Sequence, residues 1–245
     1  MAPDTAFYDQ RAASYAAASH DMDLRPLYAR FLPHVRPGGL ILDAGCGSGR
    51  DALAFRQAGF RVEAFDASPQ MARQAALLLR QEVPVLCFED VAWQERFDGI
   101  WACASLLHVA PADLPDVLRR LQRALRPGGV MFFNFKYGQG QRHSPDGRRF
   151  TDMDEAGVRA LLDALPAFLP GYADRGGRPC GGAAGTLDPG PCPAHPLFRL
   201  RRPGQQAYRR GAASAIPASL SQLPQQSPPV TCRRKKHPLR RVFSV

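Results

Sequence analysis

The stretch that decides the fold is Leu40-Ile41-Leu42-Asp43-Ala44-Gly45-Cys46-Gly47-Ser48-Gly49-Arg50-Asp51. Its apolar start predicts a buried strand over residues 40–43, and the pattern of residues 50–58 predicts a helix that Gly59 ends. Glycines between the two elements can adopt positive φ and let a ligand approach the main chain closely. The start of the helix adds unpaired N–H groups and a partial positive charge. The stretch therefore predicts a ligand-binding turn between a strand and a helix.

The spacing of the glycines narrows the class of ligand. A dinucleotide-binding turn carries glycines at its first, third and sixth positions. Here the sixth position, counted from Gly45, is Arg50. A bulky side chain at that position disfavours a pyrophosphate packed on the start of the helix. The pattern favours a ligand without phosphate, whose carboxylate meets the amides of the loop.

Two acidic residues follow later strands. Asp66 comes 21 residues after Gly45, at the end of a strand expected over residues 60–66, where a carboxylate can accept hydrogen bonds from ribose hydroxyls. The alternative, a simple cap before Ser68, is weaker because of the register with the loop. Asp90, with Val91, closes a strand expected over residues 83–88 and would lie near the base of a nucleoside. A solvated turn aspartate is an open alternative for Asp90.

The rest of residues 1–165 alternates short apolar or aromatic runs with helical patterns, which is typical of βαβ units around a parallel sheet. Further strands are expected over residues 97–104 and 130–135. Helices are expected over residues 24–35, 69–81 with Ser68 as N-cap, 113–125 and 154–165. The sequence therefore predicts an α/β fold in which helices cover both faces of a mostly parallel sheet.

Charge and composition change sharply after residue 165. Residues 166–245 hold 13 of the 32 basic residues but 2 of the 22 acidic ones, together with 13 of the 23 prolines. The net charge of +10 therefore belongs to this segment, and residues 1–165 are close to neutral, so we expect no nucleic-acid partner. We expect the segment to be a disordered tail. No apolar run is long enough to span a membrane, and the N-terminus lacks the layout of a signal peptide.

Several motifs carry a resemblance to a known family. They are Tyr8-Asp9-Gln10-Arg11-Ala12 with Tyr15, LDAGCGSGRD (42–51), FDAS (65–68), FDGIWACASLLHV (97–109), LRPGG (125–129) and FKYG (135–138). Over about residues 5–165 the chain resembles class I methyltransferases that use S-adenosylmethionine (SAM). Within them it is most similar to the small bacterial group related to tellurite-resistance-type methyltransferases. The resemblance implies a Rossmann-like methyltransferase sandwich, SAM as cofactor and a small-molecule methyl acceptor. We expect a cytoplasmic location because the N-terminus does not read as a signal peptide and three cysteines lie in apolar or glycine-loop settings that suit reduced thiols.

The resemblance also implies which residues bind SAM. Asp43 and the glycine loop would hold its methionine end and Asp66 its ribose, while residues 90–91 would flank the adenine. Residues 104–105 would line the methyl-donor channel, and Tyr15, on a lid formed by residues 1–35, would close over the cofactor. The residues expected at the cofactor are Tyr15, Asp43, Gly45, Cys46, Gly47, Gly49, Asp66, Ala67, Asp90, Val91, Ala104 and Ser105.

Methyl transfer from a sulfonium is a one-step displacement, for which no metal is expected. A general base is needed only if the acceptor must first lose a proton. His108, just past the strand expected over residues 97–104, is the best-placed base, although it equally fits a loop histidine before the turn at Pro111. Two alternatives to an active methyltransferase stay open, namely an inactive SAM-binding remnant and an NAD-dependent oxidoreductase. Arg50 disfavours the second.

The chain departs from the family after residue 165. Such proteins continue with two further strands that complete a seven-stranded sheet. Here Arg, Gly and Pro dominate the corresponding segment, so we expect the C-terminal strands to be absent, and a reading-frame shift is one explanation. Only residues 195–200 resemble a strand. A zinc site at Cys180, Cys192, His195 and Cys232 matches no compact ligand spacing, and the basic run at residues 233–236 fits a solvated end better than a nucleic-acid patch.

Overall fold

The computed structural model describes residues 5–20, 22–165, 168–174 and 195–200. The chain divides into two compact units, Met1–Arg210 and Gly211–Val245, and every described residue belongs to the first. The expectations for Cys180, Cys192, Cys232 and the basic run at residues 233–236 lie outside the described residues.

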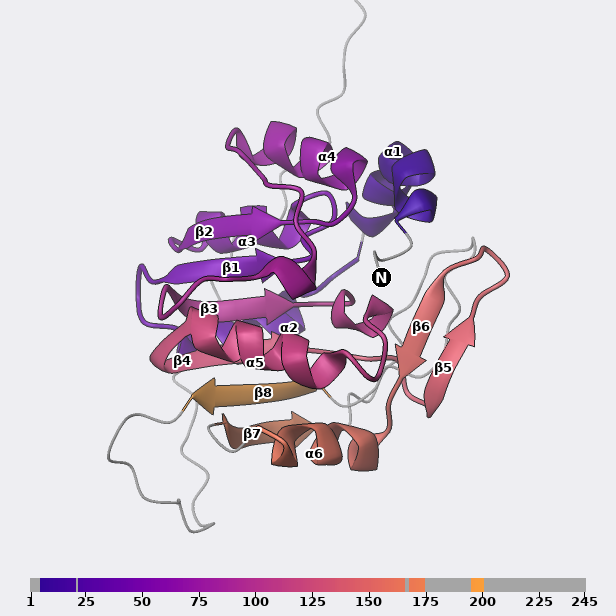
Figure 1. Ribbon diagram of the computed structural model, residues 1–245. Coiled ribbons are helices and arrows are strands. Elements are labelled where there is room, and N and C mark those ends of the chain that lie inside the picture. Colours follow the sequence, from indigo (N-terminus) through magenta and orange to yellow (C-terminus); the bar gives the residue numbers. More distant parts are fainter. Residues whose placement is uncertain (1–4, 21, 166–167, 175–194, 201–245) are drawn as a thin grey trace, which may run out of the picture. The chain divides into compact units, whose positions relative to one another are not determined.

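A six-stranded sheet forms the centre of the first unit (Figure 1). Its order is β2 (Arg61–Phe65), β1 (Leu40–Ala44), β3 (Phe97–Ala102), β4 (Leu125–Phe133), β8 (His195–Leu200) and β7 (Phe168–Asp174). The first four strands run parallel to one another, β8 is antiparallel to β4, and β7 is antiparallel to β8. This arrangement confirms the predicted α/β fold with a mostly parallel sheet.

Helices cover both faces of the sheet and bury two separate apolar clusters. The helices α2 (Arg25–Phe31), α3 (Arg50–Gln57) and α4 (Pro69–Leu79) pack on one face, while α5 (Leu114–Ala124) and α6 (Glu155–Asp163) pack on the other. Along the four parallel strands, side chains alternate between the clusters, as in Ile100 and Trp101 of β3, because side chains of a strand point to opposite faces in turn. The parallel strands are therefore buried on both sides.

The predicted start of α4 is confirmed. Ser68 is extended, and its Oγ accepts a hydrogen bond from the N–H of Met71 at 3.2 Å, while Pro69 takes the first helical position. At α6 the carboxylate of Asp154 accepts a hydrogen bond from the N–H of Gly157 at 2.8 Å. These caps place each helix at a defined distance from the preceding strand.

The strand predicted over residues 83–88 is wrong. The segment makes one parallel bridge, Val85 to Asp66, and then turns into a short 3-10 helix, Phe88–Asp90. Pro84 has no N–H to donate, which limits the ladder that this segment can form with β2. The 3-10 helix brings a different set of side chains to the end of the sheet from the one a strand would present.

The expected absence of the C-terminal strands is also wrong. Both β7 and β8 are present, and residues 195–200, the one part of the tail with a strand pattern, form β8. Composition misled the prediction because it measures apolar side chains, whereas β4 offers backbone hydrogen bonds to a strand of almost any sequence. The register of β7 shifts between Pro170 and Ala173, where the two strands accommodate their prolines.

Two elements lie at the carboxyl ends of the parallel strands (Figure 1). One is α1 (Ala6–His20), which is interrupted by the non-helical backbone of Arg11. The other is an antiparallel hairpin of β5 (Gly140–His143) and β6 (Arg149–Asp152), which the sequence did not predict. In the described ranges, the helices lack the length and apolar character needed to cross a membrane.

Candidate functional site

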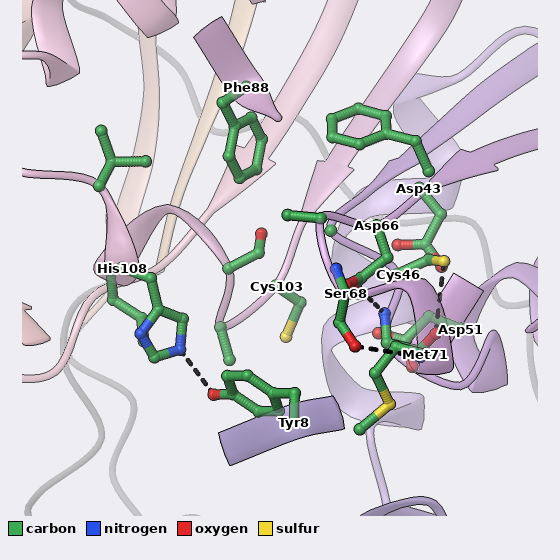
Figure 2. A pocket seen from close by; sticks show the side chains of 18 of the residues that line it. Tyr8, Asp43, Cys46, Asp51, Asp66, Ser68, Met71, Phe88, Cys103 and His108 are labelled. Carbon is green, nitrogen blue, oxygen red and sulfur yellow. Dashed lines mark hydrogen bonds between the residues drawn. The ribbon is translucent and has the colours of Figure 1, made fainter. Parts of the chain in front are cut away.

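A cavity of about 500 Å³ opens at the carboxyl ends of the parallel strands (Figure 2). The first residues after β1, β2 and β3 line it, together with α1, the end of β4 and the start of β6. Parallel strands bring their carboxyl ends to one edge of a sheet, which is where α/β proteins bind ligands. The residues predicted at the cofactor that line this cavity are Tyr15, Asp43, Gly45, Cys46, Gly47, Asp66, Ala67, Ala104 and Ser105.

The glycine loop is shaped by backbone conformation and by close packing. Gly45 and Gly47 have φ of +72° and +56°, which glycine adopts without steric cost. A Cβ on Gly45 would lie 2.5 Å from Cβ of Ser105, whose Oγ donates a hydrogen bond to the carbonyl of Ala44 at 2.8 Å. Around Gly47 an added Cβ would meet nothing within 4 Å. Gly45 therefore seats the loop on the next strand, and Gly47 leaves open space for a ligand.

Gly49, which was also predicted at the cofactor, is not among the residues that line the cavity. It precedes α3 with φ of +85°, and a Cβ there would lie 3.1 Å from Cα of Ala75. Its lack of a side chain lets α3 and α4 pack closely.

Asp66 holds the glycine loop and also faces the cavity. Its Oδ2 accepts a hydrogen bond from the N–H of Gly47 at 2.7 Å, and its Oδ1 accepts one from the N–H of Ser68 at 2.9 Å. The capping role and the ligand-facing role that the sequence presented as alternatives therefore belong to the same side chain. Burial raises the pKa of the Asp66 carboxyl above its ordinary value, although these two N–H groups oppose the change.

Asp43, at the end of β1, is more deeply buried than Asp66. Its Oδ2 accepts a hydrogen bond from the N–H of Ala52 at 3.0 Å. Burial, together with the nearby carboxylate of Asp51, raises the pKa of Asp43 well above its ordinary value. A cationic ligand in the cavity would favour the ionised form of this carboxyl.

Asp51 is held by three neighbours and also lines the cavity. Its carboxylate accepts hydrogen bonds from Tyr28 Oη at 2.7 Å, Arg50 Nε at 2.6 Å and Trp101 Nε1 at 2.8 Å. Arg50 also donates from Nη1 to the carbonyl of Ser19 in α1 at 2.6 Å. Arg50 thus joins the helix start to the end of α1.

On the loop side of the cavity, acidic side chains outnumber basic ones. We use this name for the lining residues among residues 43–51, 65–68 and 86–89. Four acids lie there, namely Asp43, Asp51, Asp66 and Glu89, against one described basic residue, Arg50. Such a surface favours a ligand with net positive charge and opposes a phosphate.

The adenine-binding prediction for Asp90 and Val91 gains no support from their positions. Asp90 is exposed and Val91 is buried in the apolar cluster beneath α5, and neither lines the cavity. Because the segment forms a 3-10 helix instead of a strand, Phe88 and Glu89 face the cavity in their place. Phe88 lies edge-on to Phe65, with ring centroids 5.4 Å apart, and these rings provide an apolar wall.

His108 lies at the other side of the cavity, in the 3-10 helix Leu106–His108. Its Nδ1 is 2.9 Å from the carbonyl oxygen of Arg149, and its Nε2 is 2.7 Å from Oη of Tyr8 (Figure 2). A carbonyl only accepts, so Nδ1 carries the proton of the neutral ring and Nε2 accepts from Tyr8. Burial lowers the pKa of His108 to about 4, and the nearby Arg148, Lys136 and Arg149 act in the same direction.

Tyr8 was quoted as part of a motif but given no role in the sequence-based prediction, and it comes from α1, which covers the cavity. The ring of Tyr8 makes edge contacts with Tyr15 and Phe7, at centroid distances of 5.2 and 5.3 Å. Asp9 accepts a hydrogen bond from Ser68 Oγ at 2.5 Å, which ties α1 to the cap of α4. No spacing rule links Tyr8 to His108, 100 residues away, so only the tertiary structure reveals the pair.

Ala104 and Ser105, predicted at the methyl-donor channel, line the cavity. Ala104 has φ of +52°, and its N–H donates to Oδ1 of Asn134 at 2.6 Å. The thiols of Cys46 and Cys103 also line the cavity, and burial raises the pKa of Cys46 well above its ordinary value. The described residues contain no group of three or more His, Cys, Asp or Glu side chains that could hold a metal ion.

Comparison with known proteins agrees with the methyltransferase resemblance for the central part of the chain. Residues 41–129 match a family described as "Methyltransferase domain". Malonyl-[acyl-carrier protein] O-methyltransferase of Erwinia pyrifoliae is 34% identical over 113 residues, which cover 43% of this chain and 41% of that protein. Cypemycin N-terminal methyltransferase of a Streptomyces species is 30% identical over 147 residues, which cover 54% of this chain and 60% of that protein. The chain spans less than half the length of the first curated relatives that it matches.

Solved structures show the same fold. The 1,6-didemethyltoxoflavin-N1-methyltransferase of Burkholderia thailandensis, solved with 1,6-didemethyltoxoflavin and S-adenosylhomocysteine (SAH), superposes with a TM-score of 0.62 at 24% identity, over 80% of this chain and 84% of that one. A Methanosarcina mazei protein described as a SAM-dependent methyltransferase superposes with a TM-score of 0.58 at 18% identity, over 74% of this chain and 100% of that one. These likenesses establish the Rossmann-like fold.

Proposed function

We propose that this chain, whose residues 41–129 belong to the methyltransferase-domain family, is a SAM-dependent methyltransferase that transfers a methyl group to a small-molecule acceptor by direct displacement. The observation that carries the proposal is the acidic loop side of the cavity next to an open glycine loop. SAM has a sulfonium and an ammonium against one carboxylate, so its net charge is positive. A dinucleotide carries a negative pyrophosphate, which the same surface would repel.

The residues present fit the parts of SAM. The open space beside Gly47 lets the methionine end of SAM approach the main chain of the loop, and the buried carboxyl of Asp43 suits its positive charge. Asp66 accepts two hydrogen bonds from the protein, and a carboxylate has about four acceptor sites, so it retains capacity for ribose hydroxyls. Phe88 and Glu89 take the place given earlier to residues 90–91, beside the adenine.

When bound, SAM supplies a methyl group that is already activated toward a nucleophile. The protein has to align the acceptor with that methyl group and keep water out. Tyr15 and Tyr8 cover the cavity from α1, and Ala104 and Ser105 border the space between the loop side and His108. No residue of the site has to form a covalent bond to the substrate.

A small acceptor is part of the proposal. It is supported by the structural neighbour solved with 1,6-didemethyltoxoflavin, by the resemblance to tellurite-resistance-type enzymes and by a cavity of about 500 Å³. We further propose a cytoplasmic location, in keeping with the free thiols of Cys46, Cys87 and Cys103. The remnant alternative rested on missing strands, and β7 and β8 are present.

Calorimetric titration of the purified full-length chain with SAM, SAH and NAD tests the proposal. We expect saturable binding of SAM and SAH, a rise in melting temperature with either ligand, and no binding of NAD. A cooperatively melting protein that binds NAD and neither SAM nor SAH would refute the assignment. A protein without a thermal transition and without SAM binding would support the remnant instead.

A further inference from the structure

We propose that Tyr8 contacts the acceptor atom and that Tyr8 and His108 together remove its proton, so that the acceptor is methylated on an oxygen or nitrogen that carries hydrogen. This inference rests on the proposed function and specifies the chemical class of its substrate. It also assigns to Tyr8, which no motif rule identifies, a direct part in the reaction.

The two side chains come from separate elements and meet at the cavity wall. Tyr8 belongs to α1 and His108 to the 3-10 helix after β3, and both line the cavity. Figure 2 shows the Tyr8 hydroxyl pointing at the imidazole, at an Oη to Nε2 distance of 2.7 Å. The pair exists only while α1 covers the cavity, so proton removal is coupled to closure of the site.

The hydrogen bonds decide which of the two groups can meet the acceptor. The Nδ1–H of His108 is committed to the carbonyl of Arg149, and the Nε2 lone pair is committed to the hydroxyl of Tyr8. A neutral imidazole then has no free site for an incoming proton. The hydroxyl of Tyr8 donates to His108, and its oxygen also accepts from the guanidinium of Arg148. The remaining acceptor capacity of that oxygen receives the acceptor's proton, which thus reaches His108 through Tyr8. His108 as a direct base, the role predicted from the sequence, is thereby changed into a base that acts through Tyr8.

The step balances in atoms and charge. A bond forms between the acceptor atom and the methyl carbon, and the carbon–sulfur bond breaks with its electron pair staying on sulfur, which yields SAH. The acceptor's proton moves to Oη of Tyr8, while the hydroxyl proton of Tyr8 moves to Nε2 of His108. The positive charge lost by the sulfonium thus reappears on the imidazolium, so the net charge inside the cavity does not change.

The surroundings of His108 explain how the pair resets. Three cations, Arg148, Lys136 and Arg149, lower the pKa of its imidazole in addition to burial, which has the largest effect. The phenol of Tyr8 has a pKa raised by burial and by Tyr15, against the opposing guanidinium of Arg148 and with a small contribution from Asp66. An imidazolium in this environment gives up its proton to water readily once the product leaves.

SAM and SAH provide a matched pair of probes, because they differ by one methyl group and one positive charge. We expect the pKa of His108, followed by NMR of histidine-labelled full-length protein, to be about one pH unit higher in the SAH complex than in the SAM complex, since a sulfonium close to the ring disfavours the imidazolium. The exposed His143 of β5 lies outside the cavity lining and is the internal control, so its NMR signals should be the same in both complexes. Equal pKa values for His108 would overturn the proposal.

Tyr8→Phe provides a second measurement at neutral pH. The ring contacts with Phe7 and Tyr15 stay, while the hydroxyl that contacts His108 is lost. Since the proposal puts this hydroxyl at the reacting centre, we expect SAM affinity to fall about threefold more than SAH affinity, because only SAM carries a polarised methyl group. Tyr137→Phe, at a half-exposed residue outside the cavity lining, is the matched control and should leave both affinities unchanged.

The outcomes separate the two proposals. If the wild-type protein binds neither SAM nor SAH, the proposed function fails. If it binds both and Tyr8→Phe weakens them equally, Tyr8 acts as a latch for α1 and only the present inference fails.

Discussion

Buried carboxylates at the two ends of the parallel strands have different partners, and their pKa values are shifted in opposite directions. At the amino end, Asp98 of β3 accepts hydrogen bonds from the N–H of Leu40 at 2.8 Å and from Arg126 at 3.1 Å, and it pairs with Arg36 at 2.7 Å. These partners outweigh burial and hold the pKa of Asp98 below its ordinary value. At the carboxyl end, Asp43 and Asp66 receive only backbone N–H groups among the described contacts, and their pKa values are raised.

The difference separates structure from binding. Arg36 and Arg126 neutralise the charge of Asp98, so this carboxylate needs no partner from outside the protein. The carboxyl groups at the other end outnumber the cations near them, which costs folding free energy and supports the proposed binding of a cationic ligand. The presence of a buried carboxylate alone does not mark a ligand site, because Asp98 is buried and fully paired within the protein.

The largest effects are expected when Gly39 or Gly47 is replaced by alanine. Gly39→Ala should mainly lower the free energy of unfolding, whereas Gly47→Ala should mainly lower SAM affinity. At Gly39, before β1, a Cβ would lie 2.8 Å from the carbonyl oxygen of Arg36 and 3.1 Å from Cβ of Asp98. We expect Gly39→Ala to lower the free energy of unfolding by about 2–3 kcal/mol through overpacking, with SAM affinity retained in the folded fraction. Urea denaturation and SAM titration measure the two quantities.

Gly47→Ala is the matched substitution at the ligand end. We expect a loss of only about 1 kcal/mol in stability, from its positive φ, because the added methyl group meets no protein atom within 4 Å. SAM affinity should fall more than about tenfold, since the methyl group occupies ligand space. A stability loss as large as that of Gly39→Ala, with SAM affinity intact, would contradict the open-loop assignment.

Replacing Asp66 or Asp98 by asparagine should show that only the carboxylate at the carboxyl end of the strands contributes to SAM affinity. Asp66→Asn should weaken SAM about 10- to 100-fold, because it removes a charged acceptor for ribose hydroxyls and one of the two acceptors that hold Gly47 and Ser68. Asp98→Asn has the same change in charge at the opposite end and should leave SAM affinity within about twofold. Calorimetry on both variants measures this contrast. An unchanged affinity in Asp66→Asn refutes the ribose assignment.

The smallest expected effect concerns pH. The contributions of Asp98 and Asp43 to the free energy of unfolding should depend on pH in opposite directions. Asp98 has a lowered pKa, so its contribution is present above the ordinary Asp value near 4 and is lost as pH falls toward its folded pKa. Asp43 has a raised pKa, so it favours folding at low pH and opposes it as pH rises through its folded pKa. At pH 7 we expect Asp98→Asn to lower the free energy of unfolding by about 1 kcal/mol.

Asp43→Asn should have the opposite sign, raising the melting temperature of the ligand-free protein at pH 7 while reducing SAM binding. Melting curves between pH 4 and pH 8 for both variants test the pair. If the two substitutions shift the melting temperature in the same direction at every pH, the contrast between the ends of the sheet is wrong.

Local patterns predicted much of the site. The apolar run before Gly45, the N-cap at Ser68 and the position of Asp66 depend on neighbours within a few residues, and the structure places all of them as expected. Predictions failed where a distant segment decides the outcome. Residues 83–88 form one bridge because of Pro84 and the edge of β2, and this local change brings Phe88 and Glu89 to the cavity instead of Asp90 and Val91.

The sequence by itself determined the α/β order and the glycine loop, because each depends on residues adjacent along the chain. Only the tertiary structure decided the last two strands, the acidic side of the cavity and the Tyr8–His108 pair. A segment can pair with β4 through its backbone even when its composition does not predict a strand. The hydrogen bond between Tyr8 and His108 joins residues 100 positions apart, and no periodic sequence pattern indicates it. Interactions between distant segments depend on the folded geometry, which local sequence patterns do not encode.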